Sequence, residues 1–224
     1  MQLFFPAHSR HYWRRISSEA RKDLNWWHRL LALGPERSIR TGTREIVFLW
    51  SDAAGTKGLG AYYICGGSIR PEAISSHTPM SIPSEPHPGE AFSVTLPRYL
   101  RTSREHINTK QMQAVEQARL HWGHKWRGKR IIMHIDNRAV AYAIENRTIR
   151  GASMNVLRRC LLLAAEYDLE ISTQWIPTKD NMLADALSHF DFDRVANIAP
   201  QLIYPATSLR DLGFRTYSKR DSPT

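Results

Sequence analysis

The sequence feature that most constrains the fold is a continuous apolar run, Glu45 to Ser51, which is rich in β-forming residues and ends at Asp52. Such a run is typical of a strand that is buried on both sides. Strand-like and helix-like stretches then alternate along the chain. The chain is therefore predicted to be an α/β protein, and its 224 residues, 42% of them apolar, suffice for one good-sized core.

Two more strands are predicted before the first helix that follows them. A segment punctuated by Gly55, Gly58 and Gly60 leads into the run LGAYYICGG, which predicts a second strand. Residues 68–77 are expected to form a third, so that the three strands make a meander. Residues 79–105 are rich in Pro, Ser and Arg and are interpreted as a long connection, and loops of that length are usually functional or mobile.

The following part of the chain alternates helices with strands. Residues 108–126 predict a helix with Gln111, Val115, Ala118 and Trp122 on one stripe. The further predicted elements are a strand at 129–136, helices at 137–146 and 152–167, a strand at 169–176 and a short helix at 181–189. Because helical crossovers favour parallel neighbours, we predict a mixed five-stranded sheet flanked by helices, with an antiparallel meander of strands 1–3 and parallel strands 4 and 5.

The segments on either side of this domain are expected to be simpler. Residues 12–33 predict a helix that Ser17 or Ser18 caps. Its predicted apolar stripe consists of Leu24, Trp27, Leu30 and Leu31. The predicted organisation is an N-terminal helical connection at 1–43, the α/β domain at 44–190 with the loop insertion at 79–105, and a loosely structured tail at 191–224.

The charge balance indicates a polyanionic partner. The formal net charge is +10 and the sequence pI is about 9.9. Neutralising phosphates releases condensed counterions, so a balance of this kind favours nucleic acid. Basic proteins that are merely soluble share the same balance, and this alternative stays open on charge alone.

The cysteines and the hydropathy pattern indicate a soluble protein inside the cell. Cys65 and Cys160 lie far apart in apolar stretches, which predicts two buried thiols and a reducing compartment. The apolar run at the N-terminus is too short for a signal peptide, and no stretch reaches the roughly 20 apolar residues of a membrane span. No membrane partner is expected, and the pattern does not distinguish cytoplasm from nucleus.

Three aspartates occupy comparable places in the predicted elements. Asp52 ends the first strand, Asp136 ends the fourth, and Asp185 lies early in the last helix. In open α/β sheets, sites form beyond the carboxyl ends of strands, so neighbouring first and fourth strands would bring these carboxylates together. Crowded carboxylates with open positions suit Mg²⁺ or Mn²⁺. A single aspartate at a strand end is more often a turn former, but three in this register favour a site for two divalent ions.

Four motifs, taken in order, add a family resemblance. They read LWSDAAGTKGLGAYY, HINTKQMQAVEQARLHW, IIMHIDNRAVAYAI and QWIPTKDNMLADALSH. Over residues 45–190 the chain resembles the ribonuclease H domain of retrotransposon reverse transcriptases, particularly of DIRS-like elements in fungi. The DLNWWHRLL segment is similar to the one that joins polymerase to ribonuclease H there. The resemblance implies a ribonuclease-H-like fold, hydrolysis of the RNA strand of an RNA–DNA hybrid by two Mg²⁺ (or Mn²⁺) ions, and a polymerase domain as a partner.

The resemblance also implies the roles of individual residues. Asp52, Asp136 and Asp185 match three of the four acidic metal ligands of the family, whereas Gln111 occupies the position of the glutamate. Glu116 lies about 140° further around the same helix, so we expect it on the surface. Lys179 stands where the family has a mobile histidine near the last strand. A glutamine has no full negative charge and a lysine does not shuttle protons near neutral pH, so both departures favour weakened or lost cleavage.

The resemblance also indicates which residues bind the hybrid. Hybrids are recognised through backbone geometry and 2′-hydroxyls, and not through base sequence. The residues expected to bind nucleic acid are Asn108, Asn137, Lys125, Arg127, Arg147, Arg150, Lys179 and Asn181. Two functions stay open: a metal-dependent ribonuclease H with a degenerate site, and a binding or scaffold module that no longer cuts. An integrase-like or exonuclease relative is less favoured, because the ADALS motif matches the reverse-transcriptase lineage.

Overall fold

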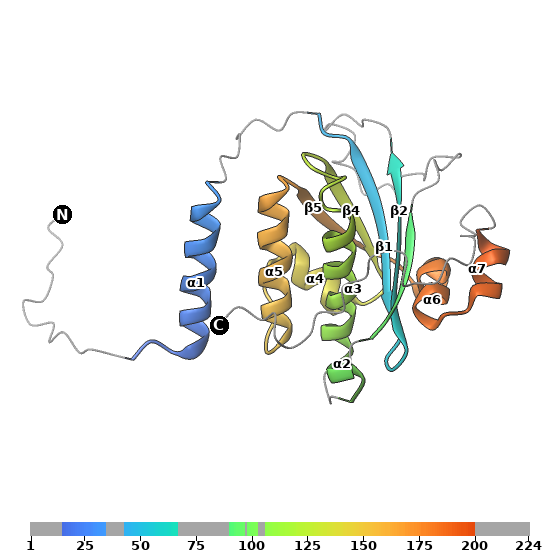
Figure 1. Ribbon diagram of the computed structural model, residues 1–224, viewed down its shortest axis with the longest axis horizontal. Coiled ribbons are helices and arrows are strands. Elements are labelled where there is room, and N and C mark those ends of the chain that lie inside the picture. Colours follow the sequence, from blue (N-terminus) through green and yellow to red (C-terminus); the bar gives the residue numbers. More distant parts are fainter. Residues whose placement is uncertain (1–14, 35–42, 67–89, 97, 103–105, 200–224) are drawn as a thin grey trace, which may run out of the picture.

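A five-stranded mixed sheet forms the centre of the molecule (Figure 1). The computed structural model describes residues 15–34, 43–66, 90–96, 98–102 and 106–199. The strands are β1 (Ile46–Ala53), β2 (Gly58–Gly66), β3 (Ala91–Thr95), β4 (Arg130–Ile135) and β5 (Glu170–Trp175). Their order is β3-β2-β1-β4-β5, with antiparallel β1–β2 and β2–β3 pairs and parallel β1–β4 and β4–β5 pairs. The predicted mixed five-stranded sheet, with an antiparallel meander of three strands followed by two parallel strands, is confirmed.

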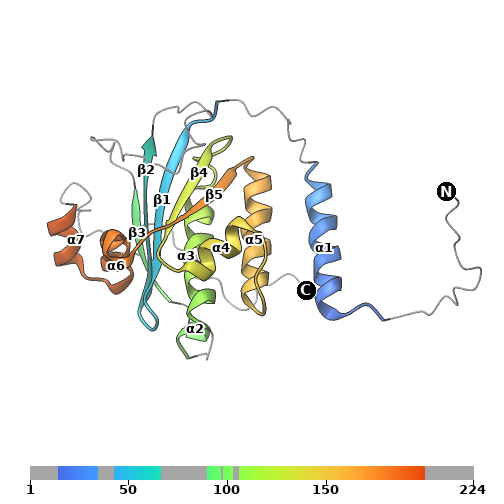
Figure 2. The same ribbon diagram turned by 180° about the vertical axis from the view of Figure 1, so that it is seen from behind.

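Helices cover both faces of this sheet. They are α1 (Ser18–Ala32), α2 (Arg98–Thr102), α3 (Ile107–Trp122), α4 (Arg138–Glu145), α5 (Ser153–Glu166), the short 3₁₀ helix η2 (Thr178–Asp180), α6 (Met182–His189) and α7 (Phe192–Ile198). Helices α3 and α5 pack on one face, and α6 and α7 lie on the other (Figures 1 and 2). None of the described helices is long and apolar enough to cross a membrane.

The alternation of side chains along β1 explains why both faces must be covered. All eight positions of β1 are buried. Val47 and Leu49 belong to the larger apolar cluster beneath α3 and α5, whereas Phe48 and Trp50 belong to a second cluster on the opposite face. Successive side chains of a strand point to opposite faces, so this fully apolar run fits only a strand with helices or loops on both sides. The prediction that the apolar run from Glu45 to Ser51 forms a strand buried on both sides is confirmed.

Within the described residues, two expectations about helices and strands and one about the burial of a cysteine were wrong. The strand that completes the meander is Ala91–Thr95, inside the stretch predicted as a connection; the predicted third strand at 68–77 lies outside the described residues. This five-residue strand is too short to show a period, and the prolines around it indicated a loop. Helix α7 occupies part of the predicted tail, where Asp191 caps it and Val195 is buried. Cys65, one residue before the end of β2, is exposed, so the prediction that it is buried was wrong, whereas Cys160 is buried as predicted.

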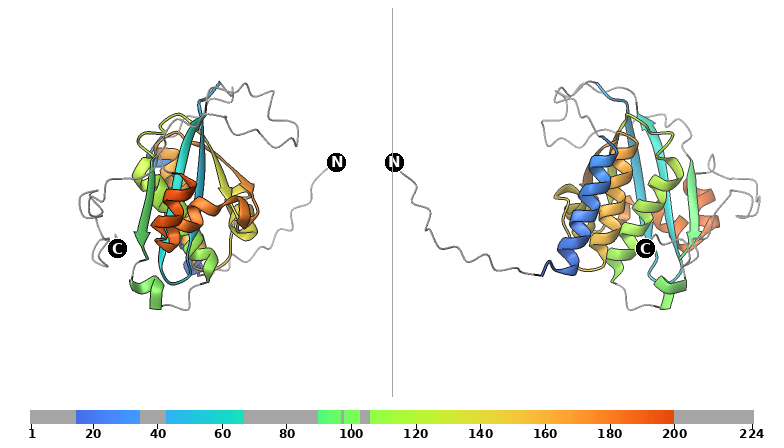
Figure 3. Two further views of the ribbon diagram at one scale, coloured as in Figure 1. Left: turned by 90° about the vertical axis from the view of Figure 1, so that its right-hand side faces the viewer. Right: turned by 60° about the vertical axis from the view of Figure 1, so that its left-hand side comes forward.

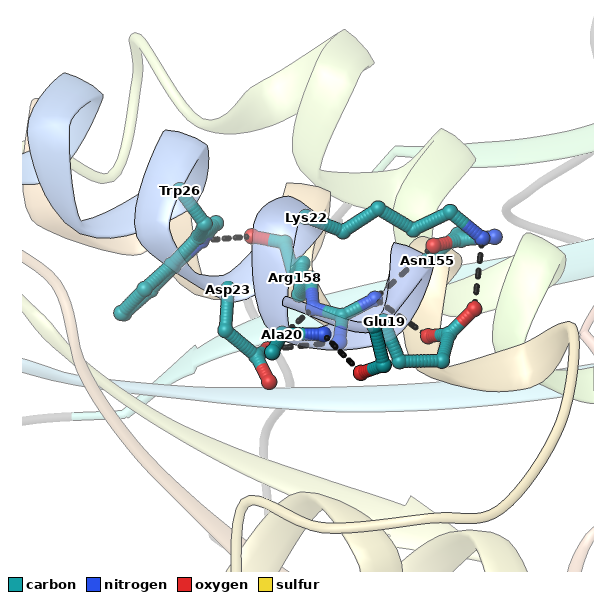
Figure 4. Close-up of polar contacts among 8 residues, drawn as sticks. Glu19, Ala20, Lys22, Asp23, Trp26, Asn155 and Arg158 are labelled. Carbon is teal, nitrogen blue, oxygen red and sulfur yellow. Dashed lines mark hydrogen bonds and ion pairs between the residues drawn. The ribbon is translucent and has the colours of Figure 1, made fainter. Parts of the chain in front are cut away.

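Helix α1 packs alongside α5 on the outer side of the helical layer (Figure 3). Ser17 caps it as predicted. Leu24, Trp27 and Leu31 of the predicted apolar stripe are 55%, 54% and 71% exposed. The side that faces α5 is polar instead: Arg158 donates to Asp23 at 2.5 and 2.9 Å, and the Trp26 indole donates to the Arg158 carbonyl at 2.8 Å (Figure 4).

Candidate metal and nucleic-acid site

The sheet register brings the first two aspartates together. Strands β1 and β4 are parallel neighbours in which Trp50 lies opposite His134. Asp52 and Asp136 each follow two residues later, so they leave the same edge of the sheet side by side. Asp52 is buried at 6% exposure, and Asp136 is half-buried. The carboxyl ends of adjacent strands thus place two carboxylates at one spot, as the sequence predicted.

The Asp52 carboxylate receives a hydrogen bond on each of its two oxygens. The Gln111 side chain, in the first turns of α3, donates from Nε2 to Oδ1 at 2.7 Å. The Ser188 hydroxyl, in α6, donates to Oδ2 at 2.5 Å. Gln111 is buried at 5% exposure. The helix register inferred from the sequence is therefore right: position 111 of α3 faces the aspartate at the end of β1.

The pKa of Asp136 reflects the negative charge of the other two aspartates. Burial raises the pKa of Asp136, and the negative charges of Asp52 and Asp185 raise it further, while a hydrogen bond from Thr178 acts in the opposite direction. One of its carboxyl oxygens, Oδ1, is buried and has no hydrogen-bond partner within the described part of the chain. Asp52 and Asp185 are therefore both close enough to Asp136 to act on its carboxyl group.

Asp185 is held by a residue that the sequence analysis missed. Arg194, in α7, donates from Nη1 to Asp185 Oδ2 at 2.6 Å, and His189 Nε2 lies 3.7 Å from Oδ1. The predicted tail contained the signal for this contact, because Asp191 precedes an apolar spacing that fits a short capped helix. A guanidinium therefore offsets the charge of Asp185.

Three asparagines that were expected to bind nucleic acid form hydrogen bonds within the protein near the aspartates. Asn137 caps α4 by accepting from Ala139 and Val140 N–H, and it donates to Asn108 Oδ1 at 2.9 Å. Asn181 is fully buried and donates to the Ser51 carbonyl at 3.2 Å. Its contact with nucleic acid stays a prediction. What the structure adds is that this amide holds the carboxyl end of β1.

The basic residues predicted to bind nucleic acid fall into separate groups. Lys125 pairs with Glu90, and the Arg127 guanidinium lies 5.2 Å from the centroid of the Tyr167 ring. Both follow α3, at the end of that helix away from Gln111, so they do not belong to the carboxylate cluster. Lys179 is exposed in η2, beside the Thr178 that bonds Asp136. Arg147 and Arg150 are exposed in the loop after α4.

Glu116 lies elsewhere than expected. It is buried at 5% exposure and accepts from the Arg159 guanidinium, at 2.9 Å for Nη2 to Oε2. The prediction that it is a surface residue was wrong, because the spacing on α3 does not reveal that α5 packs against that side. The pairing with α5 turns this carboxylate away from Asp52. Glu116 therefore does not replace the missing glutamate.

The chemistry of the donors fits a hard divalent cation in part. Among the described residues, no three Asp, Glu, His or Cys side chains are grouped so as to hold a metal ion. The buried oxygens Gln111 Oε1, Asp136 Oδ1 and Asn181 Oδ1 have no hydrogen-bond partner in the described part of the chain. Buried oxygens without a donor are uncommon, and carboxylate and amide oxygens are the ligands that Mg²⁺ prefers. The site thus offers oxygens to a cation. Asp52 already accepts hydrogen bonds from Gln111 and Ser188, however, and Arg194 already offsets the charge of Asp185.

The chain is similar to several solved structures. No family model and no curated protein matches the sequence. The N-terminal RNase H domain of a Mycobacterium tuberculosis protein is 14% identical, with a TM-score of 0.40 over 70% of this chain and 99% of that one. RNase H1 of Halobacterium salinarum is 14% identical, with a TM-score of 0.43 over 67% and 98%. An RNase H1 from compost, in complex with an RNA/DNA hybrid, is 10% identical, with a TM-score of 0.38 over 64% and 93%.

Proposed function

We propose that this chain is a ribonuclease-H-type domain that binds RNA–DNA hybrid and hydrolyses its RNA strand slowly, with a degenerate metal site. The observation that carries this proposal is the meeting of Asp52, Asp136 and Gln111 at the carboxyl edge of β1 and β4, with Asp185 close enough to raise the pKa of Asp136. The net charge of +10 supports a polyanionic substrate.

Asp52, Asp136 and Asp185 would hold Mg²⁺ or Mn²⁺, and the Gln111 carbonyl oxygen would add a neutral ligand. When bound, two such ions supply a clamp for the attacking and leaving oxygens of a phosphodiester. The residues of the chain itself do the positioning. Gln111 and Ser188 fix the rotamer of Asp52 by their hydrogen bonds. Lys179, exposed on η2, would hold a phosphate near Asp136.

A second candidate function is a module that binds nucleic acid and does not cut. The specific observation in its favour is that protein groups already offset two of the three carboxylates. Asp52 accepts from two neutral donors, and Asp185 pairs with Arg194 at 2.6 Å. A site neutralised by its own chain binds cations more weakly, because a cation must displace or compete with these partners.

The lineage and the boundaries are part of the same proposal. The four motifs favour a retrotransposon reverse transcriptase as the source, with a polymerase domain as a partner in the longer protein. We propose residues 44–190 as the functional unit, together with α7, because Arg194 reaches Asp185 from outside that range.

A cleavage assay separates the two functions. The substrate is an RNA–DNA hybrid labelled on its RNA strand, with Mg²⁺ or Mn²⁺, and the matched control is Asp136→Asn, which changes one atom group at the site. The nuclease proposal expects slow, metal-dependent cleavage that Asp136→Asn lowers by at least about 10-fold. Equal and negligible rates for the two proteins would refute cleavage and favour the binding module.

Hybrid binding without metal tests what both functions share. In EDTA, the affinity for hybrid is measured over a series of salt concentrations. Because neutralised phosphates release counterions, the logarithm of affinity should fall linearly with the logarithm of salt concentration. Binding that is absent, or that does not change with salt, contradicts both candidate functions.

A further inference from the structure

A shallow hollow of about 290 Å³ lies beside the carboxylate cluster, between α4 and the outer edge of β5. Tyr142, Asn146 and Trp175 are among the residues that line it. Tyr142 is 67% exposed and Trp175 is 40% exposed. Large aromatic side chains are rarely left in water together around one concave surface, and such surfaces usually bind something.

The hollow is joined directly to the proposed site. The Trp175 indole donates to the Asp136 carbonyl at 3.0 Å. Arg138 follows Asp136 by two residues, and its guanidinium lies 4.1 Å from the centroid of the Trp175 ring. A nucleic-acid strand that leaves the carboxylate cluster in this direction meets Arg138 and Trp175 together, because the guanidinium lies over the ring.

The charges around the hollow favour a polyanion. Glu145 is the acidic residue that lines it, and its Oε2 accepts from Thr173 N at 2.9 Å and from Thr173 Oγ1 at 3.1 Å. Glu145 thus satisfies the open edge of β5 through hydrogen bonds from neutral donors, and its single negative charge stands against the two positive charges of Arg138 and Arg147. Arg138 lies at one end of the hollow, and the exposed Arg147 follows α4 at the other. Within the described ranges, neither arginine forms an ion pair, so both are available to phosphates.

We infer that this hollow binds an unpaired base of a single-stranded extension of the nucleic acid held at the carboxylate cluster. Trp175 and Tyr142 provide the aromatic surfaces against which the base stacks, and Arg138 and Arg147 contact the flanking phosphates. Aromatic platforms beside basic side chains are the general means by which proteins hold single strands without regard to sequence. The inference deepens the proposed function, because it names the junction between hybrid and single strand as the preferred substrate.

The occupant is a nucleic-acid strand and not a protein segment, for reasons of charge. The hollow is continuous with a site already proposed for a polyanion, and its one carboxylate is engaged by Thr173. The hydrogen-bonding groups that remain, such as the Asn146 amide, suit the polar edges of a base.

The test compares hybrids with and without a single-stranded extension. Fluorescence anisotropy in EDTA measures the affinity for a blunt hybrid and for the same hybrid with an oligothymidine extension on either strand. For the unmodified chain, the extension should raise the affinity roughly 5- to 150-fold, the factor that stacking of one base typically provides. The variants Trp175→Ala and Tyr142→Ala should lose this gain and keep their affinity for the blunt hybrid.

Three control variants separate the loss of base stacking from the loss of the indole bond to Asp136 and from a loss of folding. Trp175→Phe keeps a ring but loses the indole bond to Asp136, so it should retain most of the gain. Tyr142→Ala removes a side chain that is 67% exposed and forms no hydrogen bond with the described residues, so the variant is expected to fold like the unmodified chain. Trp27→Ala removes an exposed tryptophan of α1, away from the hollow, and should change nothing.

The two proposals fail in different ways. If the unmodified chain does not bind the blunt hybrid, the proposed function is wrong. If it binds the blunt hybrid but gains nothing from either extension, or if both alanine variants keep the full gain, the inference about the hollow is overturned and the proposed function stands.

Discussion

Replacing Gln111 by glutamate probes the centre of the site. In the native chain, Gln111 Nε2 donates to Asp52 Oδ1 at 2.7 Å, and both side chains are buried. Gln111→Glu removes a hydrogen bond to a charged group, worth about 1.5–3 kcal/mol. It also places two carboxylates together, which repel by about 4 kcal/mol at 4 Å and an effective dielectric constant of 20.

The two effects do not add in full, because a crowded carboxyl pair takes up a proton. We therefore expect Gln111→Glu to lower the free energy of unfolding by about 2–4 kcal/mol at neutral pH in EDTA. A divalent cation turns the repulsion into shared attraction. At a free concentration 100 times its Kd, it should restore about 2.7 kcal/mol.

Urea denaturation in EDTA and in excess Mg²⁺ or Mn²⁺ measures both parts. Gln117→Glu adds the same charge to the same helix at a half-buried position. It should show no loss of stability in EDTA, and metal should stabilise it only as much as it stabilises the unmodified chain. If Gln111→Glu is as stable as the unmodified chain in EDTA, the packing of Gln111 against Asp52 is wrong. If it is destabilised but metal restores nothing, the region does not hold a cation.

Further predictions concern the surroundings of this site. Gly60→Ala should lower the free energy of unfolding by about 1–3 kcal/mol in urea denaturation, since a Cβ would lie 2.6 Å from the Ala184 carbonyl. Arg194→Ala should raise the Mn²⁺ affinity of the chain roughly two- to fivefold in a calorimetric titration, because it frees the half-exposed Asp185. The raised pKa of Asp136 predicts that Mn²⁺ affinity, which needs the ionised carboxylate, is lost on acidification at a higher pH than for an ordinary aspartate; Asp52→Asn should move that midpoint down. An unchanged midpoint would show that Asp52 does not act on Asp136.

The sequence predicted those parts of the fold whose signal is local. The apolar run of β1 and the stripe on α3 predicted a buried strand and a helix face, and both are where expected. The register of α3 was sufficient to place Gln111 at Asp52. The meeting of Asp52 and Asp136 was predicted on the condition that the first and fourth strands are neighbours, and β1 and β4 are parallel neighbours.

The parts that were missed depend on contacts between distant segments. The strand Ala91–Thr95 is stabilised by its pairing with β2, and its own five residues carry no clear period. Glu116 is buried because Arg159 of α5 covers it, which spacing on α3 does not reveal. The apolar stripe of α1 did not reveal that this helix contacts α5 through Asp23 and Trp26. Arg194 was missed because the last helix was interpreted as a tail.

A calorimetric titration of Mn²⁺ into the unmodified chain, and into Asp52→Asn, Asp136→Asn and Asp185→Asn, tests most directly whether the three aspartates act as one site. Each substitution removes one charge and keeps the volume of the side chain. We predict saturable binding by the unmodified chain and a loss of at least about 10-fold in affinity for each variant. Binding that all four proteins share equally, or that none of them shows, would contradict a common cation site at residues 52, 136 and 185.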